Sequence, residues 1–381
     1  MSALAALVPI GVFAGFLVFV WHRLAVAPRW GRRWVPWVLA VVLIALLAAV
    51  LEGFDVWGGA WSPATMRPVA WTGQAFLATC LYLFLGFLVL GVLKTLVMLA
   101  RWRHDRGRAG RLRLNRVGAP LVALLAVGVT GYGAYEASHP SVTEFEVSSP
   151  ELPAQFDGAR VALVTDIHAG AVRSADFTRG VVDLVNAQKP DLVVIAGDLE
   201  DGYAARYGPE LAPLRDLEAP LGVYATTGNH EMFRDTANWV RAFEDLGIRV
   251  LKNENVALDK DGASITLAGV HDISGGGEFA PDPEAALAGV DPAGFTLYAA
   301  HQPRQARDVA GRGVDLQLSG HTHGGQMWPL RYLVPLQQPV IDGLHDVGDV
   351  PVLTSRGIGA WGPAIRVAAP PELPVVTLRR G

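Results

Sequence analysis

The sequence is short of cysteine and of charge, and both shortages limit what the protein can be. A single cysteine, Cys80, stands among 381 residues and cannot form an internal disulfide. Charged residues make up only 18% of the chain, whereas an average soluble domain carries roughly 25%. Hydrophobic residues make up 51%. This composition excludes a disulfide scaffold, a collagen-like chain and a disordered chain, and the length suggests roughly two or three domains.

Acidic residues are also scarce, but only in the first part of the chain. Residues 1–140 hold 13 Lys and Arg against 4 Asp and Glu, a balance of +9. Residues 141–381 hold 19 against 32, a balance of −13. The formal net charge of −4 therefore joins a basic part to an acidic part. Such asymmetry indicates a membrane or a nucleic acid as the partner of the basic part.

Long apolar runs in the basic part favour the membrane. A helix needs about 20 apolar residues to cross the hydrocarbon core. We expect a transmembrane region over residues 1–137 with four spans, at residues 3–21, 35–51, 74–100 and 119–137. The last of these is the weakest, because it is rich in glycine. The alternative reading, buried helices of a large soluble domain, is disfavoured by the number of such runs.

Arginine is distributed unevenly between these spans. The loops after the first and third spans are rich in arginine, whereas the loop after the second contains only Arg67. Because cytoplasmic loops collect Lys and Arg, we expect a multi-pass plasma-membrane protein whose residues after the fourth span are extracytoplasmic. Without that fourth span the orientation would reverse. An RNA-binding role for the arginine-rich loop is the weaker alternative, since its flanking spans favour lipid headgroups, and no nucleic-acid partner is expected.

The acidic part has the pattern of an α/β domain. A linker over residues 138–157, mixed in proline, serine and acids, precedes a domain over residues 158–381. Short apolar runs rich in β-branched residues occur at 160–165, 191–197, 222–227, 265–270, 295–300 and 315–319. Helical stretches separate several of them, which predicts βαβ units and an α/β fold class. In open α/β sheets, ligands bind outside the carboxyl ends of the strands.

Nearly every predicted strand ends in residues that bind metals. These residues are Asp166, His168, Asp198, Asn229, His230, His301, His321 and His323. A lone histidine after a strand is usually a loop or capping residue, but five histidines at one predicted edge are hard to explain in that way. Asp166 and Asp198 are 32 residues apart, and Asp198 and Asn229 are 31 apart. Each spacing fits one βαβ step, so the groups can converge.

The mixture of donors suits a pair of metal ions. Carboxylates, imidazoles and an amide oxygen are ligands for borderline first-row metals such as Mn, Fe or Zn. Two such cations about 3.5–4 Å apart can turn a bridging water into hydroxide and hold a phosphoryl group for in-line attack. The sequence therefore predicts a dinuclear hydrolytic site.

The ordered motifs resemble a known family. They are DIH at 166–168, GDLED at 197–201, GNHE at 228–231, the lone His301 and GHTHGGQ at 320–326. In this order they resemble the calcineurin-like metallophosphoesterases, in particular the membrane-associated bacterial branch in which GHTHGGQ is typical. SRGIG at 355–359 and PAIR at 363–366 are similar to the C-terminal pattern of that branch. The resemblance covers about residues 143–378 and implies an αββα sandwich of two sheets flanked by helices.

The resemblance also implies roles for individual residues. One metal would be held by Asp166, His168, Asp198 and His323, and a second, bridged by Asp198, by Asn229, His301 and His321. His230 would stabilise or protonate the leaving oxygen, with Asp201 orienting its ring. Glu231 would contact the ligand residues and would not itself bind a metal. Arg356 and Arg366 are candidate substrate-binding residues.

A departure from the family pattern bears on the substrate class, and an apolar segment bears on contact with the membrane. Protein Ser/Thr phosphatases of this superfamily carry an arginine at the position of Phe233, so a phosphoprotein substrate is disfavoured. Residues 327–334 (MWPLRYLV) follow the last metal motif and either enter a membrane interface or form a packed loop.

The sequence as a whole therefore predicts a membrane-anchored, dinuclear metal-dependent phosphoesterase. It would use metal-hydroxide attack to hydrolyse a phosphodiester or a lipid-linked pyrophosphate. A non-catalytic membrane binding or sensor protein with a phosphoesterase-like domain is the alternative, and the complete ligand set disfavours it. A transporter is disfavoured because Lys94 is the only charge in the predicted spans that is not next to a span end.

Overall fold

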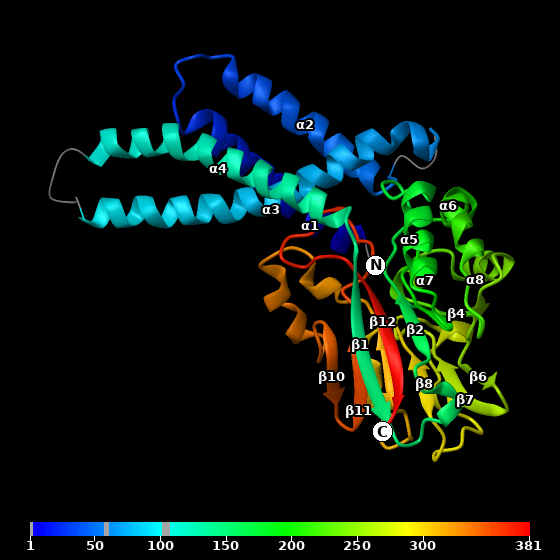
Figure 1. Cartoon of the computed structure of the whole chain (residues 1–381). Helices are drawn as coiled ribbons and strands as arrows, with labels where there is room; N and C mark the ends of the chain where they lie inside the picture. The colour runs from blue at the N-terminus through cyan, green and yellow to red at the C-terminus, as the bar shows by residue number, and fades with distance from the viewer. Residues whose placement is uncertain (1–2, 57–60, 101–106) are drawn as a thin grey trace. The chain divides into compact units, whose positions relative to one another are not determined.

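The structure, a computed structural model, describes residues 3–56, 61–100 and 107–381 (Figure 1). The chain divides into two compact units. The first contains Met1–Trp57 and Pro68–Gly133, and the second contains Gly58–Arg67 and Ala134–Gly381. Each unit is described by itself below.

The first unit is built from apolar helices. They are α1 (Ala3–Trp21), continued by the π-helical turn η1 (His22–Val26), α2 (Val35–Gly53), α3 (Pro63–Ala100) and α4 (Gly107–Ala137). Among the described residues, three segments are long and apolar enough to cross a membrane: Val35–Gly53, Pro63–Ala100 and Leu112–Ala137. They contain the predicted spans at 35–51, 74–100 and 119–137. The predicted span at 3–21 coincides with α1, but the apolar helix counted there, Gly11–Val26, is shorter than a span. That span stays a prediction.

Small and polar side chains join these helices. A Cβ on Gly73 of α3 would come within 2.1 Å of the backbone of Ala49 in α2, so only glycine permits this close approach. The hydroxyl groups of Thr79 in α3 and Thr130 in α4 are hydrogen-bonded at 3.0 Å. Large apolar side chains such as Ile44 and Leu124 are exposed. This pattern fits helices that pack at small residues and face lipid elsewhere.

The second unit contains two six-stranded sheets. The first sheet has the order β1-β12-β2-β3-β4-β5 and the second the order β10-β11-β9-β8-β7-β6. The strands of the first sheet are β1 (Ser141–Ser149), β2 (Arg160–Val164), β3 (Leu192–Ala196), β4 (Val223–Thr226), β5 (Arg249–Val250) and β12 (Glu372–Arg380). Those of the second are β6 (Glu254–Lys260), β7 (Ala263–Gly269), β8 (Thr296–Ala299), β9 (Leu316–Ser319), β10 (Gly343–Val347) and β11 (Val350–Thr354).

The alternation of side chains along the strands creates two faces for each sheet. Leu163, Val194 and Leu297 point into a core shared by the two sheets. Their neighbours Ala162 and Val193 instead pack with helical residues. The helices that cover this outer face are α5 (Ala175–Ala187), α6 (Ala204–Leu211) and α8 (Thr236–Asp245). The short α9 (Pro283–Ala286) packs on the second sheet. The predicted α/β sandwich is therefore confirmed.

The strand directions bring the predicted ligands to one edge of the sandwich. β2, β3 and β4 are parallel, and so are β7, β8, β9 and β11. The segments after these strands, including the short helix α7 (Asn229–Phe233), carry the ligand motifs. We call this end of the sandwich the site edge.

The predicted linker over residues 138–157 contains a strand. β1 begins at Ser141, with three residues between it and the end of α4 at Ala137. It pairs with β12 in parallel, with Ser141 opposite Glu372 (Figure 1). β1 is an edge strand with a single neighbour, and of its residues only Val147 and Ser149 are buried. Its polar composition therefore gave no sign of a buried strand.

Candidate metal centre

Unusual backbone conformations mark the ligand loops. The φ angle is positive at Asp166 (58°), His168 (51°), Asp198 (55°), His321 (71°) and His323 (52°). Such conformations cost roughly 1–3 kcal/mol each in non-glycine residues and cluster at functional sites. The loops are therefore held in place by their tertiary contacts rather than by local preference.

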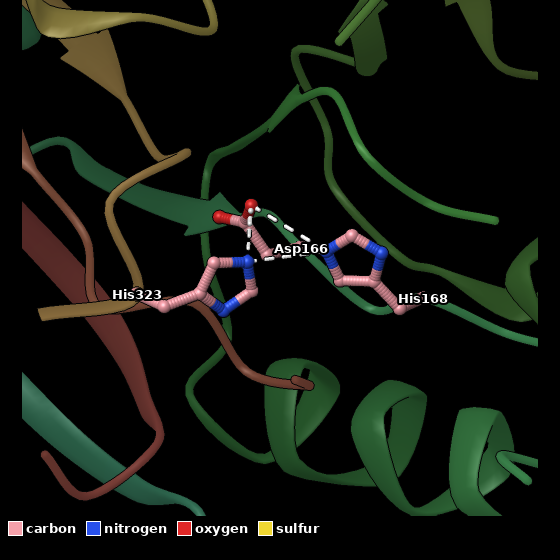
Figure 2. A group of neighbouring side chains, drawn as sticks. All are labelled: Asp166, His168 and His323. Atoms are coloured by element: carbon pink, nitrogen blue, oxygen red, sulfur yellow. Dashed lines mark hydrogen bonds and ion pairs between the residues drawn. The ribbon is translucent and has the colours of Figure 1, made fainter. Parts of the chain in front are cut away.

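Asp166, His168 and His323 form the first cluster (Figure 2). Oδ1 of Asp166 lies 3.2 Å from Nε2 of His323 and 3.8 Å from Nε2 of His168. The two Nε2 atoms are 3.2 Å apart, and all three residues are buried. Two imidazole nitrogens that face each other can share only one proton, whereas a cation can accept a lone pair from each. The donor set of this cluster fits a divalent metal ion.

Asp198, Asn229, His301 and His321 form the second cluster. Oδ2 of Asp198 lies 3.2 Å from Nε2 of His301. Oδ1 of Asn229 lies 3.1 Å from Nε2 of His301 and 2.8 Å from Nδ1 of His321. The same Oδ2 of Asp198 is 3.8 Å from Nε2 of His168 in the first cluster. Asp198 thus lies between the clusters, where a bridging carboxylate would lie.

Electrostatics leaves two of the imidazoles neutral. Burial lowers the pKa of His323 to about 3, although the Asp166 carboxylate opposes this shift. Burial and the neighbouring His301 lower the pKa of His321 to about 4. A neutral imidazole offers the lone pair that a metal ion needs. Both rings are therefore suited to ligation at neutral pH.

His230 is held by a carboxylate, and its side chain, like that of His321, is only partly buried. Oδ1 of Asp201 lies 2.6 Å from Nδ1 of His230 and 3.0 Å from Nδ1 of His168. Burial alone would lower the pKa of His230, but the Asp198 and Asp201 carboxylates outweigh it and raise the pKa to about 9. Nε2 of His230 is 4.0 Å from Oδ2 of Asp198, so distance alone also groups it with the ligands.

Glu231 holds two ligand loops together from behind. Its buried carboxylate accepts hydrogen bonds from the backbone N–H groups of Asp198 at 3.0 Å, Leu199 at 2.8 Å and Gly228 at 2.6 Å. The first two follow β3, and the third follows β4. This side chain therefore sets the distance between Asp198 and the Asn229 loop.

Arg366 is engaged within the protein. The guanidinium is fully buried and donates to the carbonyl oxygens of Gly359 at 2.6 Å and His323 at 2.9 Å. Its Nη2 also lies 3.2 Å from Nδ1 of the His323 ring. These donors are engaged within the protein and contact the His323 segment. Substrate binding by Arg366 stays a prediction.

Arg356 is also engaged within the protein. Its Nη2 lies 2.6 Å from Oε2 of Glu372, and its Nε donates to the carbonyl oxygen of Pro370 at 3.0 Å. The structure thus brings Asp166, Asp198, Asn229, Asp201 and the five predicted histidines together. Both arginines lie in the loop that follows β11, and their donors are engaged with protein groups.

Arg173 is a notable residue that the sequence did not reveal. Its side chain is buried, and its Nε and Nη2 have no hydrogen-bond partner among the described residues. The guanidinium carbon lies 4.2 Å from the ring centroid of Phe177. Ala169 pairs with both Arg173 and Glu200, so this segment runs beside Asp201. Burial lowers the pKa of Arg173 to about 10, against the Asp201 carboxylate, which raises it. Arginine in a loop is ordinarily solvated, so nothing in the sequence singled it out.

Comparisons with known proteins identify the family. The calcineurin-like phosphoesterase family matches residues 159–325. A transmembrane protein with metallophosphoesterase domain from Bos taurus is 34% identical over 325 residues, which cover 79% of this chain and 72% of that protein. The protein of the same name from Danio rerio is 31% identical over 312 residues, which cover 79% of this chain and 70% of that protein. An uncharacterized metallophosphoesterase from Helicobacter pylori is 33% identical over 276 residues, covering 71% and 72%.

The chain therefore belongs to the calcineurin-like metallophosphoesterase family, which acts with divalent metal ions on phosphoesters. More particularly, it is a membrane protein of that family, since its apolar helices accompany relatives that are named transmembrane proteins. The predicted family, fold class and enzyme class, a phosphoester hydrolase, are confirmed. The role of each ligand, the number of metal ions and their identity stay predictions.

Replacing Glu231 should separate the two ligand loops. We expect Glu231→Ala to lower the free energy of unfolding by about 3 kcal/mol or more, because three buried N–H groups lose their acceptor. Denaturant unfolding of the full chain in detergent measures the change. Glu218→Ala, at an exposed glutamate, is the matched control and should change stability by less than about 0.5 kcal/mol. Equal stabilities of the two variants would contradict the bracing role of Glu231.

Proposed function

We propose that this protein is a membrane-anchored phosphoesterase with two divalent metal ions, and that it hydrolyses a phosphodiester or a lipid-linked pyrophosphate. The observation that carries the proposal is the position of Asp198 between two clusters of side chains that can bind metal ions. One ion would be held by Asp166, His168, His323 and Asp198. The other would be held by Asp198, Asn229, His301 and His321. The nitrogen and oxygen donors suit Mn, Fe or Zn.

The chain's own residues supply the proton chemistry. When bound, the metal ions would polarise a phosphoryl oxygen and activate water for attack. His230 would carry the proton for the leaving oxygen on Nε2, because its Nδ1 is held by Asp201 at 2.6 Å. Asp201 also contacts His168, so one carboxylate orients both a predicted ligand and the predicted acid.

An apolar group beside His230 supports a lipid-linked substrate over a phosphoprotein. The ring centroid of Phe233 lies 5.0 Å from that of His230, and the Phe233 side chain is exposed. A phenylalanine cannot pair with a second phosphate or an acidic peptide. It can contact the hydrocarbon part of a leaving group that His230 protonates.

We also propose that residues 141–381 are on the extracytoplasmic side of the plasma membrane. Seven arginines lie between residues 101 and 116, immediately before the apolar part of α4. Because arginine-rich loops stay in the cytoplasm, a single crossing by α4 would carry the following domain outside. That orientation follows whether or not α1 crosses the membrane.

Arg173 is proposed to bind an anionic oxygen of the substrate. The buried Nε and Nη2 of Arg173 have no hydrogen-bond partner among the described residues, which is costly, since desolvation of a charge amounts to several kcal/mol. The segment around it runs beside Asp201, so a phosphate group at the site would provide the missing partner. Arginine is well suited to this role because its planar donors match phosphate oxygens.

Variants of Asp198 and His230 test the mechanism. His230→Gln should lower kcat by about 10²- to 10⁴-fold while leaving Mn²⁺ affinity unchanged, since only a proton donor is lost. Asp198→Ala should abolish activity and weaken the binding of Mn²⁺ at both sites. Hydrolysis of a chromogenic phosphodiester and of a polyprenyl pyrophosphate, together with calorimetric Mn²⁺ titration, measures these effects.

The controls for these variants use the same chain. His345→Gln, at an exposed histidine of β10, should leave activity and metal binding as in the parent protein. A chelator should remove the parent activity, and added Mn²⁺ should restore it. Full activity in Asp198→Ala or His230→Gln would contradict the proposed mechanism.

The orientation is testable with reporters fused to the chain in a bacterial host. Alkaline phosphatase fused after Gly381 should be active, because that enzyme works outside the cytoplasm, and a fluorescent protein fused there should be dark. Fusions after Asn115, within the arginine-rich segment, should give the opposite pair of results. The same pattern at both positions would show that α4 does not cross the membrane.

Replacing Arg173 separates substrate binding from a structural role. If Arg173 serves an anion, Arg173→Met should raise the free energy of unfolding, because an unpaired buried charge is removed. It should also weaken inhibition by inorganic phosphate by roughly 10- to 100-fold, as expected for a lost charge-assisted hydrogen bond of about 1.5–3 kcal/mol. Arg173→Lys keeps the charge, so its stability and its inhibition by phosphate should lie between those of the parent protein and those of Arg173→Met. Lower stability with unchanged phosphate inhibition would instead assign Arg173 to packing on Phe177.

A further inference from the structure

The exposed apolar side chains of the second unit are confined to one end of it. Within the described residues 141–381, the large apolar side chains that remain exposed are Tyr203, Phe233, Trp328, Tyr332, Leu333, Leu336 and Trp361. All of them lie in segments that follow strands β3, β4, β9 and β11, at the site edge. A soluble surface would scatter such residues, so their confinement indicates a surface that contacts something apolar.

Five of these residues form what we call the apolar collar: Trp328, Tyr332, Leu333, Leu336 and Trp361. Their side chains are between 48% and 80% exposed. Most of them lie on or beside two consecutive 3₁₀ turns, η7 (Leu330–Tyr332) and η8 (Val334–Leu336), just after the GHTHGGQ motif.

Direct contacts attach the collar to the candidate metal centre. A Cβ on Gly325 would come within 2.2 Å of the backbone of Arg331, so η7 lies directly against the metal-binding loop. The side chain of Gln326 donates to the carbonyl oxygen of Trp361 at 2.9 Å and accepts from its N–H at 3.2 Å. Both parts of the collar are therefore fixed to residues that immediately follow His323.

The chain enters this unit at the same edge. Ser141 pairs with Glu372, whose N–H donates to the carbonyl oxygen of Gly357 in the loop that also carries Trp361. α4, which is long and apolar enough to cross a membrane, ends at Ala137, so only three residues separate it from the site edge. Even fully extended, that link spans no more than about 14 Å.

We propose that the apolar collar binds the surface of the lipid bilayer that the chain's own helices cross. A short link holds the site edge near the headgroups, and tryptophan and tyrosine favour that interface because they combine an apolar ring with a polar tip. Leu333 and Leu336 would reach the acyl boundary. The binding of the collar is independent of catalysis, but the conclusion that a phosphoester is taken from the bilayer rests on the proposed function.

Spin labels measure the depth of the collar in the full-length protein. With Cys80→Ala as background, a label is attached at Tyr332→Cys or Leu336→Cys, and the chain is placed in phosphatidylethanolamine–phosphatidylglycerol nanodiscs. Asp261→Cys, at the exposed β6–β7 turn at the opposite end of the sheets, is the control. We expect collisions with oxygen to exceed those with a water-soluble nickel chelate at both collar positions and the reverse at Asp261. Equal access of the nickel chelate at all three positions would overturn the proposal. Shielding of the collar from both reagents would also overturn it, since protein rather than lipid would then cover the surface.

A kinetic measurement separates this proposal from the proposed function. The double variant Tyr332→Ser/Leu336→Ser should lower hydrolysis of a polyprenyl pyrophosphate embedded in nanodiscs at least 10-fold relative to hydrolysis of a water-soluble phosphodiester. An unchanged ratio, together with lipid-exposed labels, would reject the collar as a route for the substrate. Absence of hydrolysis in the parent protein would instead reject the proposed function, while the label measurement would still decide whether the collar binds lipid.

Discussion

The buried carboxylate of Asp198 is the group on which the site depends. Its oxygens lie within 4.0 Å of ring nitrogens of His168, His230 and His301, and these imidazoles hold the pKa of Asp198 well below its usual range despite burial, which raises it. A buried charge is tolerated only when it is closely surrounded by partners. The left-handed loop conformations and the brace from Glu231 therefore serve one requirement, which is to bring opposite charge to this point from several strands.

Much of this site could be predicted from the sequence because parallel strands impose a rule. Their carboxyl ends meet at one edge, so Asp166, Asp198 and Asn229 could be expected to converge from spacing alone. The two-sheet arrangement could not be obtained in that way, since alternation of strands and helices is compatible with a single sheet, and only the resemblance supplied it.

The residues that escaped prediction share a physical reason. β1 has one neighbour and few buried side chains, so its sequence resembles that of a linker. Arg366 and Arg173 are arginines in loops, where solvation is the ordinary state, and only the tertiary structure shows that both are buried. Carbonyl oxygens compensate the burial of Arg366. The Nε and Nη2 of Arg173, by contrast, have no hydrogen-bond partner among the described residues. That difference supports the proposed binding role of Arg173.

The strand that follows the membrane region is connected to the metal centre by hydrogen bonds rather than by a flexible linker. The N–H of Ser141 donates to the carbonyl oxygen of Pro371, and the hydroxyl of Thr143 donates to Glu372. Glu372 is paired with Arg356, whose carbonyl oxygen accepts from Arg366, and Arg366 holds His323. Each link joins residues that are fixed by backbone pairing or burial, so the site edge cannot rotate freely about the end of β1. The candidate metal centre therefore has a fixed position relative to the start of β1, which a flexible linker would not give.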